Sequence, residues 1–524
     1  MLHELLDRSA TRRPDAVALS YRASSATYAE VRAATLRLAA GLARLGISRG
    51  DRIAVHLANR PEAVELAFAA SRIGAIFMPL NPGLRARQLA HVLKDSGARM
   101  LITSGAIAPQ LIGTALPELE FLVASDAQPG DLEIGAIRAL RLQDLHQHSP
   151  DAESLARGAD FSPRDLAALF YTSGSTGLPK GVMLSHANLT AGAVTVSQYL
   201  GNEPADRILV ALPWSFDYGF NQVATAFAVG ACAVLTNYAS AAALINEIHD
   251  ERITALAGVP TMWMQLAAAR WRASPPAALR YITNSGGALH AATIRALQAL
   301  LPATRIFCMY GLTEAFRSTY LDPAELPRRS GSIGKAVPGQ QVVVVDEAGR
   351  ECAADVVGEL VHRGSFVSQG YWNDDPLTRR RFRPFPIDTN GDMAVWSGDL
   401  ARRDAEGFLW FVGRLDDQIK ISGVRVSPTE IETVAAEVPG VAACVAVGVA
   451  DELLGQRIVL YVTAAASSPE LADRIREHCR RQLPNYAAIS AVVFEPDLPL
   501  TATGKPDRAV LAARAAHSPA EQGH

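Results

Sequence analysis

The chain has 524 residues and a formal net charge of -3, with 49% hydrophobic and 20% charged residues. This length exceeds what one hydrophobic core normally organises, so two or more domains are expected. The small net charge argues against a broad nucleic-acid-binding surface, and we expect no nucleic-acid partner. Five scattered cysteines form no CxxC pair, which disfavours a disulfide framework or a zinc site and fits a reducing cytoplasm.

The sequence predicts no membrane anchor. Its first fifteen residues carry Glu4 and Asp7 where a signal peptide needs an apolar core, so they predict an amphipathic helix. The longest apolar run, residues 223–235, is too short to span a bilayer and predicts a buried strand–helix segment. We therefore expect a cytoplasmic protein.

Short β-branched runs alternate with Ala/Leu-rich helical patterns over most of the chain. The alternation predicts an α/β fold whose large N-terminal domain contains helix-covered, mainly parallel sheets. Ligands of such folds bind beyond the carboxyl ends of the strands. The pattern predicts helices at 61–73 and 291–301, and strands at 52–57, 100–103, 208–212, 253–259, 279–284 and 305–310.

The pattern changes after about residue 335. Runs at 341–346, 358–362 and 408–412 predict the shorter strands of a β-rich subdomain, about 335–415, within an N-terminal domain of residues 1–415. A small mobile C-terminal α+β domain, 416–524, is expected beyond the charged segment 413–423, with its tail disordered after about 515. Its pattern predicts helices at 427–437 and 469–482 and strands near 443–449, 457–464 and 490–495.

Residues 171–181 read YTSGSTGLPKG and follow an apolar run, 166–170, that predicts a buried strand. A loop of this composition presents backbone N–H groups and hydroxyls to an anion, and its glycines allow close approach. Lys180 adds a point charge suited to phosphate. The order of residues differs from a Walker loop, and a flexible linker is the alternative explanation of the composition. We predict a polyphosphate-binding loop.

Five further motifs follow in order: SGGAL at 285–289, YGLTE at 310–314, WSGDL at 396–400, GRLDDQIKISGVRV at 413–426 and TGKPDR at 503–508. Together with 171–181 they resemble the AMP-forming adenylating superfamily of acyl-CoA synthetases, adenylation domains and luciferases, and the resemblance covers nearly the whole chain. It implies an AMP-forming ligase. Such an enzyme converts a carboxylate and ATP, with Mg²⁺, into an acyl-adenylate, and then transfers the acyl group to a thiol.

The resemblance also implies roles for individual residues in adenylation. Thr313 would contact the α-phosphate, Glu314 would ligate Mg²⁺, and Lys505 would swing in to bridge the carboxylate and the α-phosphate. An exposed solubilising lysine is the alternative for Lys505. The β- and γ-phosphates would be held by Thr172, Ser173, Gly174, Ser175, Thr176, Gly177 and Lys180.

The nucleoside would bind between separate motifs. Tyr310 would stack on adenine, with a core aromatic as the alternative, and Asp399 would bind the ribose hydroxyls, with a turn-capping role as the alternative. Arg414 would reach ribose or phosphate. The remaining residues of the nucleotide site would be Gly286, Gly287, Ala288 and Gly311.

A lysine on a separate small domain implies motion between the two half-reactions. Asp416 matches the hinge of the family, although the neighbouring Asp417 leaves the assignment uncertain by one residue. In the rotated conformation the thiol would approach a face formed by Lys420, Gly423 and Arg425.

The segment 212–222 is expected to recognise the carboxylate substrate. Adenylation domains for α-amino acids hold the substrate ammonium with an aspartate of an FD pair, which Asp217 matches. Asp217 could instead cap a helix or pair with Arg317, and Arg317 could instead bind a second acidic group of the substrate. The other expected pocket residues are Tyr218, Asn221, Ser285, Met309 and Ser318.

The longer strings SFDYGFNQ, TNSGGAL and MYGLTEAFRSTYL resemble exosortase-associated acyl-CoA ligases and prolyl carrier-protein ligases. These two groups differ in the acceptor, which is CoA in one and the phosphopantetheine of a carrier protein in the other. The motifs leave this choice open, and with it a carrier-protein partner. An adenylating enzyme with a non-thiol acceptor and a luciferase-like oxygenase are the alternative functions.

Overall fold

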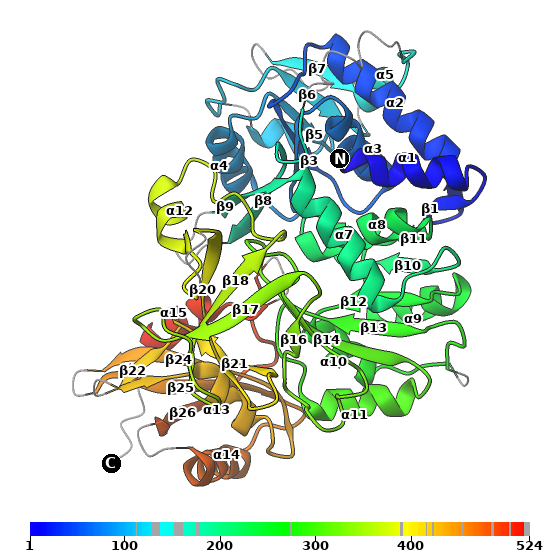
Figure 1. Cartoon of the computed structure of the whole chain (residues 1–524). Helices are drawn as coiled ribbons and strands as arrows, with labels where there is room; N and C mark the ends of the chain where they lie inside the picture. Colours follow the sequence, from blue (N-terminus) through cyan, green and yellow to red (C-terminus); the bar gives the residue numbers. More distant parts are fainter. Residues whose placement is uncertain are drawn as a thin grey trace.

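The computed structural model describes residues 1–111, 113–126, 137–150, 161–173, 179–272, 275–387, 391–415, 417–421, 424–451, 454–483, 487–501 and 505–517. Figure 1 shows the N-terminal third at the top, the green middle third at the lower right, and the orange-to-red C-terminal part at the lower left. Across these ranges, no helix has the length and apolar character that a bilayer-spanning segment requires.

A seven-stranded sheet forms the first layer of the N-terminal region. Its strands are parallel except for the last pair, in which β8 and β9 run antiparallel. In spatial order they are β7(Arg138–Arg141), β6(Phe121–Ala124), β5(Met100–Thr103), β3(Arg52–His56), β4(Ile76–Pro79), β8(Leu166–Ser173) and β9(Pro179–Ser185).

A nine-stranded sheet forms the second layer. Its central strands are parallel, and both edges end in antiparallel pairs. In spatial order they are β16(Lys335–Ala336), β15(Thr319–Leu321), β14(Arg305–Tyr310), β13(Tyr281–Asn284), β12(Ala255–Gly258), β10(Arg207–Val210), β11(Cys232–Leu235), β1(Val17–Tyr21) and β2(Ser24–Thr27).

Helices cover both sheets, and their ends follow ordinary capping chemistry. Thr27 and Ser185 each form a capping box, and Gly97 ends α4 in the left-handed conformation. The helices of this region are α1(His3–Arg12), α2(Tyr28–Arg44), α3(Pro61–Arg72), α4(Ala86–Ser96), α5(Leu142–Leu145), α7(His186–Leu200), α8(Asp217–Val229), α9(Ala241–Asp250), α10(Pro260–Ala268) and α11(Ala291–Leu300), with a 3₁₀ turn at η1(Ala108–Leu111).

Helix α8 lies between the two sheets. Its Phe220 packs against Phe77 of β4 and Phe170 of β8, with ring centroids 5.1 and 5.8 Å apart, while the helix also contacts β10 and β11. Every residue from Asp217 to Phe227 is buried as a result. A helix enclosed on all sides is normally apolar throughout, so the buried polar residues of α8 are exceptions: Asp217, Asn221, Gln222 and Thr225.

The β-rich subdomain is one five-stranded antiparallel sheet. It consists of β17(Gln340–Val345), β18(Gly358–Gly364), β20(Met393–Arg403) and β19(Phe382–Pro384), with β21(Leu409–Arg414) paired to β20, and it includes the short helix α12(Asp375–Arg381).

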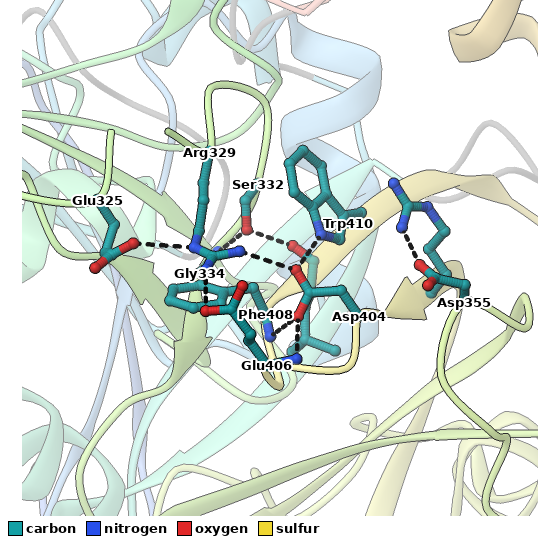
Figure 2. Close-up of polar contacts among 11 residues, drawn as sticks. Glu325, Arg329, Ser332, Gly334, Asp355, Asp404, Glu406, Phe408 and Trp410 are labelled. Carbon is teal, nitrogen blue, oxygen red and sulfur yellow. Dashed lines mark hydrogen bonds and ion pairs between the residues drawn. The ribbon is translucent and has the colours of Figure 1, made fainter. Parts of the chain in front are cut away.

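Arg329 fastens the β20–β21 turn to the preceding segment (Figure 2). Its guanidinium lies over the Phe408 ring at 3.9 Å and pairs with Glu325, Asp404 and Glu406. Backbone hydrogen bonds between Leu409 and residues 333 and 334 complete the attachment. The far end of the same hairpin carries Asp399 opposite Arg414, so the turn anchors a strand pair that leads into the site.

The C-terminal sheet has the order β23(Val424–Val426), β22(Ile419–Ile421), β25(Gly455–Ala464) and β24(Val441–Asp451), with β26(Ile489–Phe494) beside β25. Alternate residues of its long strands bury two faces, as the pleat requires. One face packs under α13(Pro428–Ala435) and α14(Pro469–Gln482), and the other under α15(Arg508–His517).

The fold class is confirmed: a large N-terminal α/β domain with mainly parallel sheets, a β-rich subdomain and a small C-terminal domain. The expected run 223–235 is the end of α8 followed by β11, and the expected N-terminal helix is α1. Expected strands match within one to three residues at their ends. The boundary near 415 stays a prediction, because residue 416 and the tail beyond 517 lie outside the described residues.

Candidate active site

The loop after β14 is wound tightly and presents several predicted site residues. Phe316 adopts a left-handed backbone with φ of 53°, which is uncommon for a bulky residue and indicates local strain. Two glycines make room for it: a Cβ on Gly311 would lie 2.1 Å from the Phe316 carbonyl oxygen, and one on Gly192 would lie 2.4 Å from its ring. The wound loop directs Thr313, Glu314 and Arg317 into one region.

Asp399 lies at the centre of a polar cluster. The Tyr310 hydroxyl donates to Asp399 Oδ2 at 2.5 Å, and Arg414 Nε lies 3.4 Å from Oδ1, which accepts no hydrogen bond from the described residues. Burial raises the pKa of Asp399, although Arg414, the Tyr310 hydroxyl and Lys505 oppose the shift. A buried carboxylate oxygen with an unfilled position suits an added hydroxyl donor.

Tyr310 lies beside two aromatic rings. Its ring lies 5.9 Å from the His362 ring at an interplanar angle of 24°, and 6.1 Å from the Phe411 ring. Burial and the neighbouring Asp399 carboxylate raise the pKa of Tyr310 well above its ordinary value, so its hydroxyl remains a donor. The expectation of adenine stacking on this ring stays a prediction.

Glu314 accepts a hydrogen bond from the Tyr371 hydroxyl at 2.6 Å. Among the residues that the structure describes, no group of three acidic, histidine or cysteine side chains could hold a metal ion. A single carboxylate nevertheless fits Mg²⁺, which is usually bound by one or two carboxylates together with substrate phosphates and water. Glu314 can therefore supply the protein ligand, oriented by Tyr371.

Lys505 reaches this cluster from the C-terminal domain. Its Cε lies 3.7 Å from the position that a Cβ on Gly286 would occupy, in the loop after β13. Surrounding protein lowers the pKa of Lys505, while Asp399, Asp217 and Glu314 raise it and Arg414 lowers it further. The residue nevertheless keeps exposed surface.

The lysine loop is anchored at its base. Arg508 donates to Glu432 of α13 and to the carbonyl of Ala446, and the Thr501 amide donates to the Lys505 carbonyl at 2.7 Å. The Leu415 amide bonds the Gly398 carbonyl at 2.7 Å, one residue before Asp399. Arg508 and Thr501 therefore attach the Lys505 segment to the C-terminal domain, and the Leu415 bond ties the start of the junction to β20.

The expectation of a phosphate-binding loop stays a prediction, and the structure describes only the strands that flank it. Thr172 pairs with Lys180 across the β8–β9 hairpin, so the loop joins two antiparallel strands rather than a strand and a helix. Residues Gly174, Ser175, Thr176 and Gly177 lie outside the described residues, as does the side chain of Ser173. Asp416 and Gly423 also lie outside them, and Lys420 and Arg425 are paired on β22 and β23.

The loop after β13 lies next to Lys505. Gly286 has φ of +83°, a conformation that favours glycine, and the Asn284 amide donates to the Gly287 carbonyl at 2.9 Å. Gly287 and Ala288 are exposed, whereas Ser285 is buried. A Cβ on Gly287 would lie 3.1 Å from Pro260 Cγ, so this loop packs closely against the start of α10.

The predicted substrate pocket centres on Asp217 and Arg317. Arg317 Nη1 lies 3.6 Å from Asp217 Oδ2, and Thr313 Oγ1 donates to Asp217 Oδ1 at 3.3 Å. The guanidinium carbon lies 4.1 Å from the Tyr218 ring centroid. The pairing of Asp217 with Arg317, one of the alternatives from the sequence, is therefore present. The remaining pocket residues, Asn221, Ser285, Met309 and Ser318, are all buried.

Comparison with known proteins identifies the family. The model of the AMP-binding enzyme family matches residues 6–372, and the model of the AMP-binding enzyme C-terminal domain matches residues 430–505. The chain belongs to the AMP-binding enzyme family. It is an AMP-forming ligase of the acyl-CoA synthetase and adenylation-domain type, which confirms the coarse resemblance.

Two relatives illustrate the breadth of the family. This AMP-binding enzyme is 32% identical to feruloyl-CoA synthase of Amycolatopsis sp over 509 residues, which cover 95% of this chain and 96% of that protein. It is 29% identical to a linear gramicidin synthase polypeptide of Brevibacillus parabrevis over 513 residues, which cover 97% of this chain but 10% of that protein.

Solved structures agree over nearly the whole length. The anthranilate CoA ligase AuaEII in complex with anthranoyl-AMP superposes with a TM-score of 0.87 at 26% identity, covering 98% of this chain and 97% of that one. O-succinylbenzoate coenzyme A synthetase from Bacillus subtilis, in complex with ATP and a magnesium ion, gives 0.80 at 25% identity, with 96% and 98% covered.

Sequence reasoning missed Tyr371, His362 and Asn284 as neighbours of the site. Tyr371 stands in the run 369–372, QGYW, whose glycine and two adjacent aromatic residues were the available signal. Asn284 belongs to the TNSGGAL string, but no role was given to it. The AMP-binding enzyme therefore has a second layer of side chains that orient the predicted ones.

Proposed function

We propose that this AMP-binding enzyme is an acid–thiol ligase that activates a small carboxylic or amino acid as its adenylate and then forms a thioester. The observation that carries the proposal is the position of Lys505, from the far end of the chain, beside Gly286 and the Asp399 cluster. This arrangement suits adenylate formation, in which the C-terminal lysine must meet the reacting groups.

In the first half-reaction, a carboxylate oxygen attacks the α-phosphorus of ATP, the bond to the β-phosphate oxygen breaks, and pyrophosphate leaves. The Lys505 ammonium binds the oxygens on which negative charge is concentrated, with Thr313 beside it. Asp399 and Tyr310 hold the nucleoside, so binding energy is used for positioning. Glu314, oriented by Tyr371, would hold Mg²⁺, which would neutralise phosphate charge.

In the second half-reaction, a thiol sulfur attacks the acyl carbon, AMP leaves, and the thiol proton passes to solvent. The C-terminal domain would rotate about Asp416 so that the Lys420–Arg425 hairpin replaces Lys505 at the site. The acceptor would be the phosphopantetheine thiol of CoA or of a carrier protein. The narrower resemblance to exosortase-associated and prolyl carrier-protein ligases leaves the same two acceptors.

Two coupled assays test the proposal. Acid-dependent exchange between ATP and pyrophosphate should appear with a suitable acid, and the product should then form a thioester with CoA or a carrier protein. Lys505→Ala should abolish exchange while thiolation of supplied acyl-adenylate persists. Equal loss of both steps in that variant would contradict the role given to Lys505. Oxygen-dependent product, or product without a thiol, would favour the alternative functions.

A further inference from the structure

The buried polar cluster of α8 and the β14 loop contains five atoms without a hydrogen bond in the part of the chain that the structure describes. They are Asp217 Oδ2, Asn221 Oδ1 and Nδ2, and Arg317 Nε and Nη2. All three side chains are at most 3% exposed. Buried polar groups normally form hydrogen bonds, because leaving one without a partner destabilises the fold, so this concentration indicates a bound partner.

A purely structural ion pair is the plain alternative, and the same protein contains one for comparison. Arg280 donates through Nε and Nη2 to the two oxygens of buried Asp206, at 3.1 and 2.8 Å, and Nη2 also reaches a carbonyl oxygen. Arg317 instead approaches Asp217 only through Nη1, at 3.6 Å. The Nε and Nη2 atoms of Arg317, which together can donate two parallel hydrogen bonds to one carboxylate, donate none among the described residues.

The charge balance limits what can bind. Arg317 already compensates Asp217, so a substrate ammonium alone would leave one unbalanced positive charge in the buried cluster. A second carboxylate alone would leave one unbalanced negative charge. A buried unbalanced charge is destabilising in either case, whereas an ammonium and a carboxylate together restore neutrality. Burial raises the pKa of Asp217 despite Arg317, so an added cation at Oδ2 would also favour its ionised form.

We infer that the acid activated by this enzyme is an amino dicarboxylic acid, with one carboxylate at the reaction centre and the other on the free edge of Arg317. Its ammonium donates to Asp217 Oδ2 and Asn221 Oδ1. The Tyr218 ring, whose centroid lies 4.1 Å from the guanidinium carbon, packs against the guanidinium and fixes its orientation. This assignment rests on the proposed function, because it concerns the acid that the same site adenylates.

The test is ATP–pyrophosphate exchange over a matched panel. Aspartate, glutamate and 2-aminoadipate carry both groups; asparagine and glutamine lack the second anion; succinate and glutarate lack the amine; butyrate and benzoate lack both. At least one amino dicarboxylate should exceed its matched analogues in kcat/KM by on the order of 10², as expected when a buried charged partner is removed.

Two variants should exchange the preference rather than abolish it. Arg317→Gln should move selectivity toward the matched amide, and Asp217→Asn toward the matched acid without the amine. Arg305→Gln, at the exposed start of β14, is the matched control and should leave the ranking unchanged. Melting curves and calorimetric binding of AMP establish that each variant is folded.

The outcomes separate the two proposals. If acids lacking the amine or the second carboxylate exchange as well as the amino dicarboxylates, this inference is overturned while the ligase function stands. An unchanged ranking in Arg317→Gln overturns it as well. If no acid of any class supports exchange, both the function and the substrate assignment fail.

Discussion

Replacing Tyr371 by phenylalanine tests the geometry around Glu314. The change removes one hydroxyl that donates to Glu314 at 2.6 Å, and keeps the ring that packs edge-on to Phe382 at 5.8 Å. A hydrogen bond to a charged group contributes about 1.5–3 kcal/mol. Since about 1.4 kcal/mol corresponds to a tenfold change in an equilibrium constant, losing this bond should weaken Mg²⁺ binding about 10- to 100-fold.

The assay is acid-dependent ATP–pyrophosphate exchange at fixed ATP, with Mg²⁺ titrated over a wide range. The half-saturating Mg²⁺ concentration should rise in Tyr371→Phe, and saturating metal should restore most of the rate. Tyr320→Phe, which removes a hydroxyl from β15 of the same protein, is the control and should behave like the wild type. A Tyr371→Phe enzyme with unchanged Mg²⁺ dependence and an unchanged rate would refute the claim that Tyr371 orients a metal ligand.

Three further predictions concern charge, backbone and pH. Because the pKa of Lys505 is lowered and its protonated form binds the oxyanions, the adenylation rate should fall as pH rises through that lowered value. Lys505→Arg should shift this alkaline fall in rate to higher pH. If the fall does not shift, its cause is the titration of another group. Gly311→Ala should unfold the β14 loop and lower Tm and activity, because its Cβ would meet the Phe316 carbonyl oxygen. The control Gly201→Ala places its Cβ in open space. It should lower the free energy of unfolding by only about 1–2 kcal/mol, because alanine disfavours the left-handed backbone of that position. Burial raises the pKa of Asp7, but the ion pairs with Arg72 and Arg32 outweigh burial and lower the pKa below its ordinary 3.8. The ionised carboxylate therefore adds about 1 kcal/mol to the free energy of unfolding above pH 3.8, and this contribution is lost as pH falls. The Tm values of wild type and Asp7→Asn should converge in acid, and a constant difference would be inconsistent with this role.

The sequence located the loops that carry the expected site residues best where strand topology brings those loops together. Ser285 and Gly286 follow β13, and Gly311 and Thr313 follow β14; these parallel neighbours end at the same edge of one sheet. Local apolar runs and turn residues determine such strands, so reading them in order locates the loops. The fold class followed from the same alternation.

Contacts that depend on tertiary structure could not be predicted. Tyr371 and Glu314 form a hydrogen bond although they lie 57 residues apart in the sequence. No periodicity of the sequence links a loop of the β-rich subdomain to the segment after β14. The antiparallel pairing of β8 and β9 around the predicted phosphate-binding loop was also missed, because a buried strand has the same sequence pattern in parallel and antiparallel pairs. That Arg317 Nε and Nη2 lack hydrogen-bond partners among the described residues depends on the rotamer and on distances, which residue types alone do not determine.

The most direct test of the account is the fate of ATP in the presence of the purified protein, magnesium and a broad panel of organic and amino acids. The account predicts AMP and pyrophosphate in equal amounts, formed only when a suitable acid is present and lost in Lys505→Ala. Formation of ADP and phosphate would contradict the account. So would AMP formation that depends neither on the added acid nor on Lys505.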